Sequence, residues 1–349
     1  MKLTITKTKR NPYLDYLRGI SALLVLLFHY TSRYDMLYGH VENYPFMMSR
    51  GSFAVLMFFL LSGYLTFKGL NRYEPKSFVK NRFFRLYPTY WLCLIPTMVL
   101  VSIFLPDQVV SIKDFALNFT MLQLYLGVKF VDGAYWTLSC EVLFYVLIVL
   151  LLAFKGKRYG THLLLGWFVL QVILLLLPDS GFYMLAKKFN RFLYFHCFMA
   201  GGVVAILEEW LKEMNSKRTR SSWLASILLI LALVFFIAQQ FIDHEFDSGV
   251  FMAVSVVLLG GSIVLYEKVG GVFSCLHKLL APLAWIATIS YPLYLLHQNI
   301  GYIIIQQMER HGMTNELFLL IPITIIMIAA WLIHKYIEQP CSRIGIKKQ

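Results

Sequence analysis

The segment Tyr13–Tyr30, YLDYLRGISALLVLLFHY, determines the class of protein. After Asp15 and Arg18 it is apolar up to a single histidine, His29, and the residues up to Tyr34 complete a span of the bilayer, whose apolar core is about 30 Å thick. Similar apolar runs recur along the chain without the alternation of barrel strands. Because only helices and closed barrels satisfy their backbone in lipid, we predict an all-α polytopic membrane protein.

The composition favours the same class. The 349 residues are 58% hydrophobic, and the mean hydropathy of +0.64 is too high for a soluble globule of this length. The net charge of +13 fits either a nucleic-acid ligand or membrane loops rich in Lys and Arg on the cytoplasmic side. In a membrane protein the second explanation is the simpler one, so we expect no nucleic-acid partner.

Ten segments are predicted to span the bilayer, at about residues 14–34, 52–70, 87–105, 135–154, 161–178, 191–208, 223–241, 249–266, 282–306 and 317–336. With the N-terminus placed in the cytoplasm, most of the 32 Lys and Arg residues fall on the cytoplasmic side. This bias predicts that both termini are cytoplasmic. We therefore expect one integral-membrane domain over residues 1–349, in the cytoplasmic membrane.

Of the ionisable residues inside the predicted spans, three matter most for function: His29, Glu141 and His297. At a rise of about 1.5 Å per residue, His29 and Glu141 are expected at a similar depth near the outer surface, with His297 somewhat deeper. A carboxylate beside an imidazole orients it and stabilises its protonated form, which suits a general base. Alternatively, each histidine makes a structural hydrogen bond to a neighbouring helix. Cys140 is either a nucleophile or a packing residue.

A second group of charged residues is arginine-rich. Arg82 and Arg85 in KNRFFRLYPTYW share one helix face, and paired guanidinium groups suit phosphates, although ordinary anchoring at the cytoplasmic surface explains the same charges. Arg18 lies eleven residues before His29, about 16 Å along a helix. A ligand with a phosphate at Arg18 and its reacting atom at His29 must be long and thin, as a phosphopantetheine arm is. No two Cys or His residues have metal-ligand spacing, so we predict no metal site.

In this order, the segments resemble the motifs of the membrane acyltransferase 3 family, whose bacterial members O-acylate cell-surface and exported carbohydrates. The resemblance covers nearly the whole chain. It rests on an arginine–histidine motif, a Ser-Gly motif, a paired-arginine motif, a Trp-x-Leu-x-x-Glu motif and two late elements: YLDYLRGISALLVLLFHY, MFFLLSGYL, KNRFFRLYPTYW, YWTLSCEVLFY, SYPLYLLHQ and YIEQP.

The resemblance implies ten helices around a pore-like cavity and an acyl-CoA donor, most simply acetyl-CoA, that enters from the cytoplasm. No permanently bound cofactor is expected. The acceptor would be a hydroxyl of a surface polysaccharide or lipid-linked sugar at the outer face. The catalytic residues would be His29, as base or acyl-carrying nucleophile, and Glu141, which orients it. The binding residues would be Arg18, Arg82 and Arg85 for CoA phosphates, with Ser62, Gly63, Tyr291 and His297 as supporting positions.

Two other functions use the same buried charges. A carrier or flippase for a polysaccharide precursor would bind its substrate there, although no internal repeat of the kind common in transporters is visible. A non-catalytic scaffold has no use for costly ionisable groups in a span. The sequence therefore favours a membrane O-acetyltransferase over both alternatives.

Overall fold

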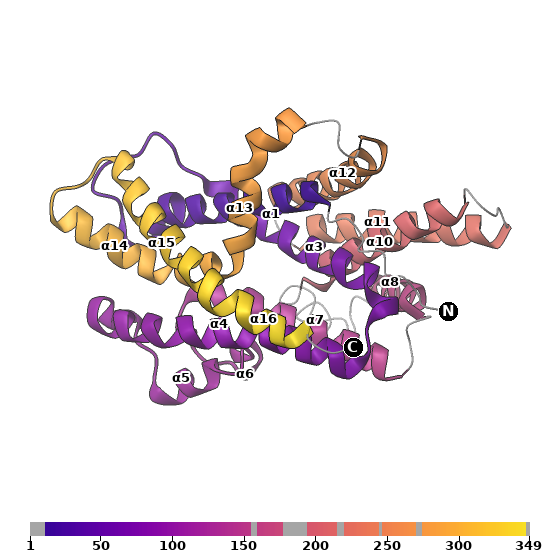
Figure 1. Ribbon diagram of the computed structural model, residues 1–349, viewed down its shortest axis with the longest axis horizontal. Helices are drawn as coiled ribbons and strands as arrows, with labels where there is room; N and C mark the ends of the chain where they lie inside the picture. Colours follow the sequence, from indigo (N-terminus) through magenta and orange to yellow (C-terminus); the bar gives the residue numbers. More distant parts are fainter. Residues whose placement is uncertain are drawn as a thin grey trace.

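The computed structural model describes residues 11–154, 159–176, 194–214, 220–243, 246–269 and 274–346. Within these ranges every regular element is helical, which confirms an all-α protein (Figure 1). In the same ranges six helices are long and apolar enough to cross a membrane: Ser49–Lys68, Pro75–Phe104, Gly133–Ala153, Phe246–Lys268, Lys278–Leu296 and Glu316–Gly345. The chain is therefore a multi-pass membrane protein, while the count of ten spans and the cytoplasmic termini stay predictions.

The predicted spans are largely helical where the structure describes them; residues 177–178 and 191–193 of two spans lie outside the described ranges. The principal helices are α1 (Pro12–Phe28), α3 (Val55–Lys68), α4 (Pro75–Phe104), α7 (Trp136–Ala153), α8 (Gly160–Leu176), α10 (Phe195–Met214), α11 (Arg220–Asp243), α12 (Phe246–Val269), α13 (Ser274–Leu296), α14 (Asn299–Arg310) and α15 (Leu320–Ile333). Shorter helices are α2 (Tyr34–Tyr38), α5 (Ile112–Asn118), α6 (Gln123–Leu126) and α16 (Gln339–Ile346).

The predicted span 282–306 is wrong in one respect, because it is not a single helix. α13 ends at Leu296, and α14 begins at Asn299 after a break at His297 and Gln298. The sequence is apolar on both sides, and no proline or glycine marks the break itself. Hydropathy therefore cannot locate it.

The first predicted span ends in a π-helical turn. α1 continues beyond Phe28 as His29–Arg33, where the N–H of Tyr34 donates to the carbonyl oxygen of His29, five residues earlier. A second π turn, His334–Glu338, follows α15. Such turns are rare and often occur at functional sites, so the first one draws attention to His29.

Glycines allow the closest helix contacts. A Cβ at Gly19 would lie 2.1 Å from the carbonyl oxygen of Leu283, so the backbones of α1 and α13 are in contact. A Cβ at Gly63 would lie 2.0 Å from the carbonyl oxygen of Phe198, which brings α3 equally close to α10. α4 packs against both α7 and α13. These contacts assemble the helices that surround the central cavity.

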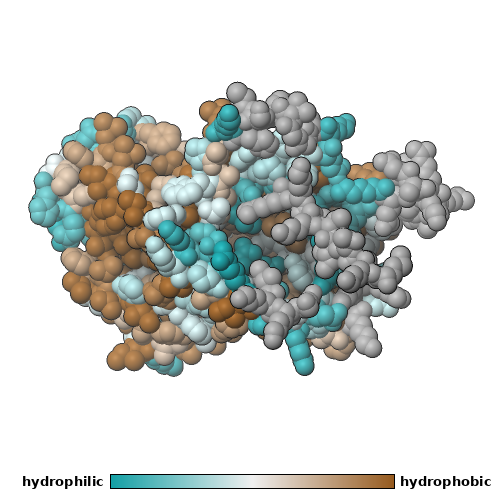
Figure 2. Space-filling model, in the orientation of Figure 1, coloured by the Kyte–Doolittle hydropathy of each residue, from teal (hydrophilic) through white to brown (hydrophobic). Residues whose placement is uncertain are grey.

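The surface of the bundle is apolar over a wide area. Exposed large side chains include Ile103, Leu320 and Ile328. In Figure 2 hydrophobic residues gather at the left of the view, where Figure 1 places α14 and α15. An exposed apolar surface of this kind is typical of contact with lipid.

Candidate active site

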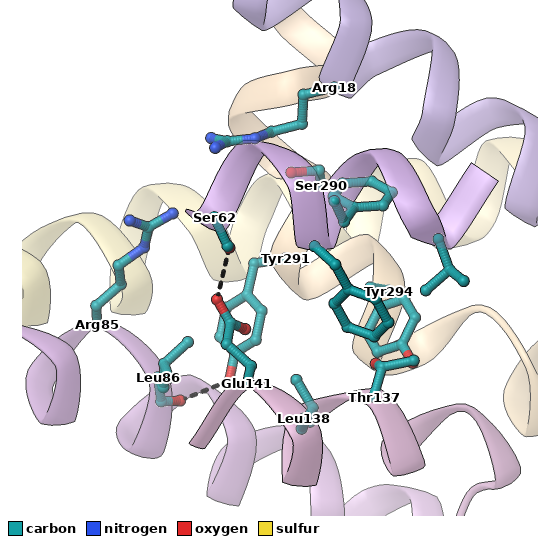
Figure 3. A pocket seen from close by; sticks show the side chains of 13 residues that line it. Arg18, Ser62, Arg85, Leu86, Thr137, Leu138, Glu141, Ser290, Tyr291 and Tyr294 are labelled. Atoms are coloured by element: carbon teal, nitrogen blue, oxygen red, sulfur yellow. Dashed lines mark hydrogen bonds between the residues drawn. The ribbon is translucent and has the colours of Figure 1, made fainter. Parts of the chain in front are cut away.

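A cavity of about 100 Å³ lies where α1, α3, α4, α7 and α13 meet (Figure 3). Arg18 from α1 and Arg85 from α4 reach toward it from different helices. Ser62 from α3, Glu141 from α7 and Tyr291 from α13 complete its polar lining. The structure therefore brings together residues that lie far apart in the sequence and that the motifs had singled out.

Glu141 is held inside this cavity by two hydroxyl groups. Its Oε1 accepts hydrogen bonds from Ser62 Oγ at 3.0 Å and from the Tyr145 hydroxyl at 2.5 Å. The hydroxyl of Tyr291 donates to the carbonyl oxygen of Leu86 at 2.9 Å, which ties α13 to α4 (Figure 3). The carboxylate thus occupies a defined position between two helices that carry arginines.

The two arginines of the paired motif have different surroundings. Arg85 lines the cavity, whereas the guanidinium of Arg82 lies 4.5 Å from the ring centre of Tyr145 and 5.0 Å from that of Phe78. Contacts of this type are cation–π interactions. Arg82 thus packs behind Tyr145 and is not part of the cavity lining, and the prediction that both arginines bind the donor stays a prediction.

Two further expectations about small residues are settled by packing. Gly63, expected to be a supporting position of the site, faces α10 at backbone contact and is not part of the cavity lining, whereas its neighbour Ser62 faces the cavity. Cys140 is fully buried and is not part of the cavity lining. This position favours a packing role for Cys140 over a role as nucleophile.

His29 and His297 form a pair of imidazoles, with ring centres 4.7 Å apart and ring planes at 83°. The Nδ1 atom of His29 lies 2.8 Å from the hydroxyl oxygen of Tyr302. The Nδ1 atom of His297 lies 2.7 Å from the carbonyl oxygen of Tyr294 and must donate, because a carbonyl only accepts. In the neutral ring this leaves the lone pair on His297 Nε2, a buried atom with no hydrogen-bond partner among the described residues.

The predicted pairing of Glu141 with His29 is not found. Both residues are described, and no hydrogen bond or ion pair joins them; Glu141 bonds to Ser62 and Tyr145, whereas His29 bonds to Tyr302. Counting residues along a helix estimates depth in the membrane but not direction around the bundle, so residues at one depth can face different neighbours. Sequence reasoning also missed Tyr302, since tyrosines near a membrane surface are common.

A second, smaller chamber lies beside the larger cavity. Its volume is about 10 Å³, enough for about one water molecule, and His297 forms part of its wall. It shares Phe58, Ser290 and Tyr294 with the larger cavity. Arg18 in the larger cavity, the small chamber and the imidazole pair therefore follow one another along α1, although His29 itself lines neither cavity.

The family model described as an acyltransferase domain, of the acyltransferase 3 type, matches residues 11–335. That range contains the cavity and the imidazole pair. ORF330 of Acidianus two-tailed virus, named provisionally as an acetyltransferase, is 24% identical to this chain over 307 residues, which cover 85% of each protein. No solved structure gives a significant match to the chain.

Proposed function

Because the chain belongs to the acyltransferase 3 family and is thus an acyltransferase, we propose that it transfers acetyl groups from cytoplasmic acetyl-CoA to a hydroxyl of an envelope glycan. The acceptor would be a surface polysaccharide or a lipid-linked sugar, and the enzyme would lie in the cytoplasmic membrane. One observation carries the proposal: an arginine-lined cavity shares part of its wall with a small chamber lined by His297, and the ring of His297 packs against that of His29.

The donor would bind at the arginine end. Arg18 and Arg85 line the cavity from two helices, and guanidinium groups bind phosphates through charge-assisted hydrogen bonds. A volume of about 100 Å³ holds the end of a pantetheine arm but not a nucleotide. The nucleotide of the donor would therefore remain on the cytoplasmic side, with its phosphates near the arginines and its thioester further along α1.

The chemistry would take place at the imidazole pair. His29 is partly exposed, whereas His297 is buried, so His29 is the ring that an acceptor from outside can reach. In the tautomer suited to a base, Nδ1 of His29 donates to the Tyr302 oxygen and Nε2 accepts the proton of the acceptor hydroxyl. Two imidazolium ions this close would repel, which favours a neutral pair at the start.

The transfer balances without a further reactant. The acceptor oxygen forms a bond to the thioester carbonyl carbon as its proton passes to His29 Nε2. The carbon–sulfur bond then breaks, and the thiolate of CoA leaves and takes up the proton. In the alternative, His29 itself first carries the acyl group, and the enzyme would then become labelled before the glycan does.

The small chamber favours a small acyl group. Its apolar walls include Phe58, Val25 and Leu293, and at about 10 Å³ it holds about one water molecule, so any acyl group needs these side chains to move and the smallest acyl group needs the least movement. We therefore favour acetyl over succinyl or longer acyl donors.

The experiment uses the purified protein in lipid, radiolabelled acetyl-CoA and glycan from the host envelope whose ester groups have been removed with mild alkali. The expected result is glycan-dependent release of CoA, with the label recovered on the glycan as an alkali-labile ester. His29→Ala should lose both signals. Transport of the glycan without any label, or CoA release that is independent of glycan, would reject the proposal and would favour the carrier in the first case.

A further inference from the structure

The break between α13 and α14 is held by a carboxylate from another part of the chain. Asp132 Oδ2 accepts a hydrogen bond from the backbone N–H of Asn299 at 2.9 Å, and Asp132 Oδ1 accepts one from the N–H of Ala134 at 2.9 Å. Asn299 is the first residue of α14, and the first N–H groups of a helix have no acceptor within the helix. Asp132 thus supplies the cap that this helix lacks in its own sequence.

The same short segment makes three more hydrogen bonds across the break. The side-chain amide of Asn299 donates to the carbonyl oxygen of Val131 at 3.0 Å. The hydroxyl of Tyr135 donates to the carbonyl oxygen of Leu295 at 2.9 Å, and the hydroxyl of Tyr294 donates to the carbonyl oxygen of Ala134. We call residues 131–135 with these bonds the clasp.

A glycine lies next to the side chain of the break. A Cβ at Gly133 would lie 2.6 Å from Nε2 of Gln298, which forms part of the break. Because this atom is the end of a flexible side chain, a larger residue at position 133 would first displace the Gln298 amide. The carboxylate is therefore held against the break by its hydrogen bonds.

Burying the carboxyl group of Asp132 at the break costs free energy. It is 1% exposed, and no Lys, Arg or His forms an ion pair with it among the described residues. Burial raises the pKa of its carboxyl to about 7, although the two backbone N–H donors act in the opposite direction. A buried acid without a cation costs stability, so a functional reason for it is expected.

The clasp holds both partners of His29. His297, which packs against the His29 ring, lies at the break, and Tyr302, whose hydroxyl lies 2.8 Å from His29 Nδ1, follows in the first turn of α14. The hydropathy of this region fits one continuous helix, and continuing α13 through the break would turn one of these side chains away. The break therefore sets both contacts to His29.

We propose that Asp132 is a positioning residue for acyl transfer, which acts by fixing the α13–α14 break so that His297 and Tyr302 both contact His29. The proposal rests on the acyltransferase function above. It assigns no contact between Asp132 and either substrate. The clasp also leads directly into α7, so it fixes the helix of Glu141 relative to the imidazole pair.

The test compares Asp132→Ala and Asp132→Asn in the lipid-reconstituted protein with acetyl-CoA and de-esterified envelope glycan. Because a misplacement of about 1 Å can cost about 100-fold in rate, we expect Asp132→Ala to lower kcat by about 10- to 100-fold, with the KM for acetyl-CoA within about twofold of wild type. Asp132→Asn keeps one acceptor oxygen and should recover part of the rate. The matched control is Asp107→Ala, an exposed carboxylate in the same connection between α4 and α7.

A second readout does not depend on turnover. Side-chain nitrogen NMR of histidine-labelled protein should show His297 with its proton on Nδ1, with the signal assigned by its loss in His297→Gln. Asp132→Asn should give a mixture of tautomers, because a loosened break weakens the bond to the Tyr294 carbonyl. If wild-type protein transfers no acetyl group, the proposed function fails, and the tautomer still tests the clasp. An unchanged tautomer in Asp132→Asn, an unchanged kcat in both variants, or a loss confined to KM would each overturn the proposal.

Discussion

Removing the hydroxyl of Tyr302 should slow acyl transfer without weakening donor binding. In Tyr302→Phe the ring that packs at 5.7 Å from both Tyr34 and Tyr38 is kept, while the 2.8 Å contact to His29 Nδ1 is lost. The net value of a neutral hydrogen bond is about 1 kcal/mol, and that of a bond to a charged group is about 1.5–3 kcal/mol. As His29 takes up a proton, its hydrogen bond to Tyr302 changes from a neutral bond to a bond from a charged group.

Only the difference between the neutral and the charged hydrogen bond affects the rate of acyl transfer. A loss of about 0.5–2 kcal/mol of transition-state stabilisation corresponds to a fall in kcat of about 2- to 30-fold. The assay measures kcat and KM for acetyl-CoA with the de-esterified glycan at saturation. The KM should stay within about twofold, because Tyr302 is not part of the donor cavity.

Tyr87→Phe is the matched control for this prediction. Its hydroxyl donates to the carbonyl oxygen of Thr120 at 3.0 Å and does not line the cavity, so this variant also loses one tyrosine hydrogen bond. Both variants should lose about 1 kcal/mol of stability. Equal kcat values for the two variants, or a loss in Tyr302→Phe that appears only in KM, would refute the role of Tyr302 at His29.

The remaining predictions concern the donor path and the fold. His29→Ala should abolish transfer while acetyl-CoA still binds, and turnover above about a tenth of wild type would exclude His29 as the base. Arg85→Ala should raise the KM for acetyl-CoA more than Arg82→Ala does, with partial recovery in Arg85→Lys; equal shifts in KM would contradict the different positions of the two arginines. Phe58→Ala removes a wall that both chambers share, and should raise kcat/KM for butyryl-CoA relative to acetyl-CoA; a constant ratio would show that Phe58 does not limit acyl length. Gly63→Ala should lower the yield of folded protein, because the added Cβ meets backbone of α10, and a normal thermal midpoint would contradict this packing argument.

The sequence predicts the helices well because each apolar run must cover its own backbone in lipid. The segment after Tyr13 and the run that contains Glu141 are helical for this reason. The break after His297 could not be predicted in the same way. It depends on a hydrogen bond from Asn299 to Asp132, 167 residues away, and hydropathy contains no information about such a contact.

The candidate site was predictable to a similar extent. The family motifs singled out Arg18, Ser62, Arg85 and Glu141, and these residues do converge on one cavity. The partner of His29 was assigned incorrectly, because depth along a helix does not determine which neighbour a side chain faces. The partner that the structure shows is Tyr302, and nothing in the sequence distinguishes it from the other tyrosines nearby.

The narrow chamber also bears on how the cell keeps its membrane electrically sealed. An enzyme that uses a cytoplasmic donor at the outer face needs a passage through the bilayer, and an open passage would let ions dissipate the membrane potential. On the proposed acyl route the tightest part would be the chamber of about 10 Å³, whose walls include Phe58, Val25 and Leu293. An ion that entered would lose its hydration at a cost of several kcal/mol, whereas a potential of 100 mV supplies only about 2.3 kcal/mol per elementary charge. An uncharged acetyl group would meet no such desolvation penalty, so under the proposed function side chains that move aside for the acyl group would still oppose the passage of ions.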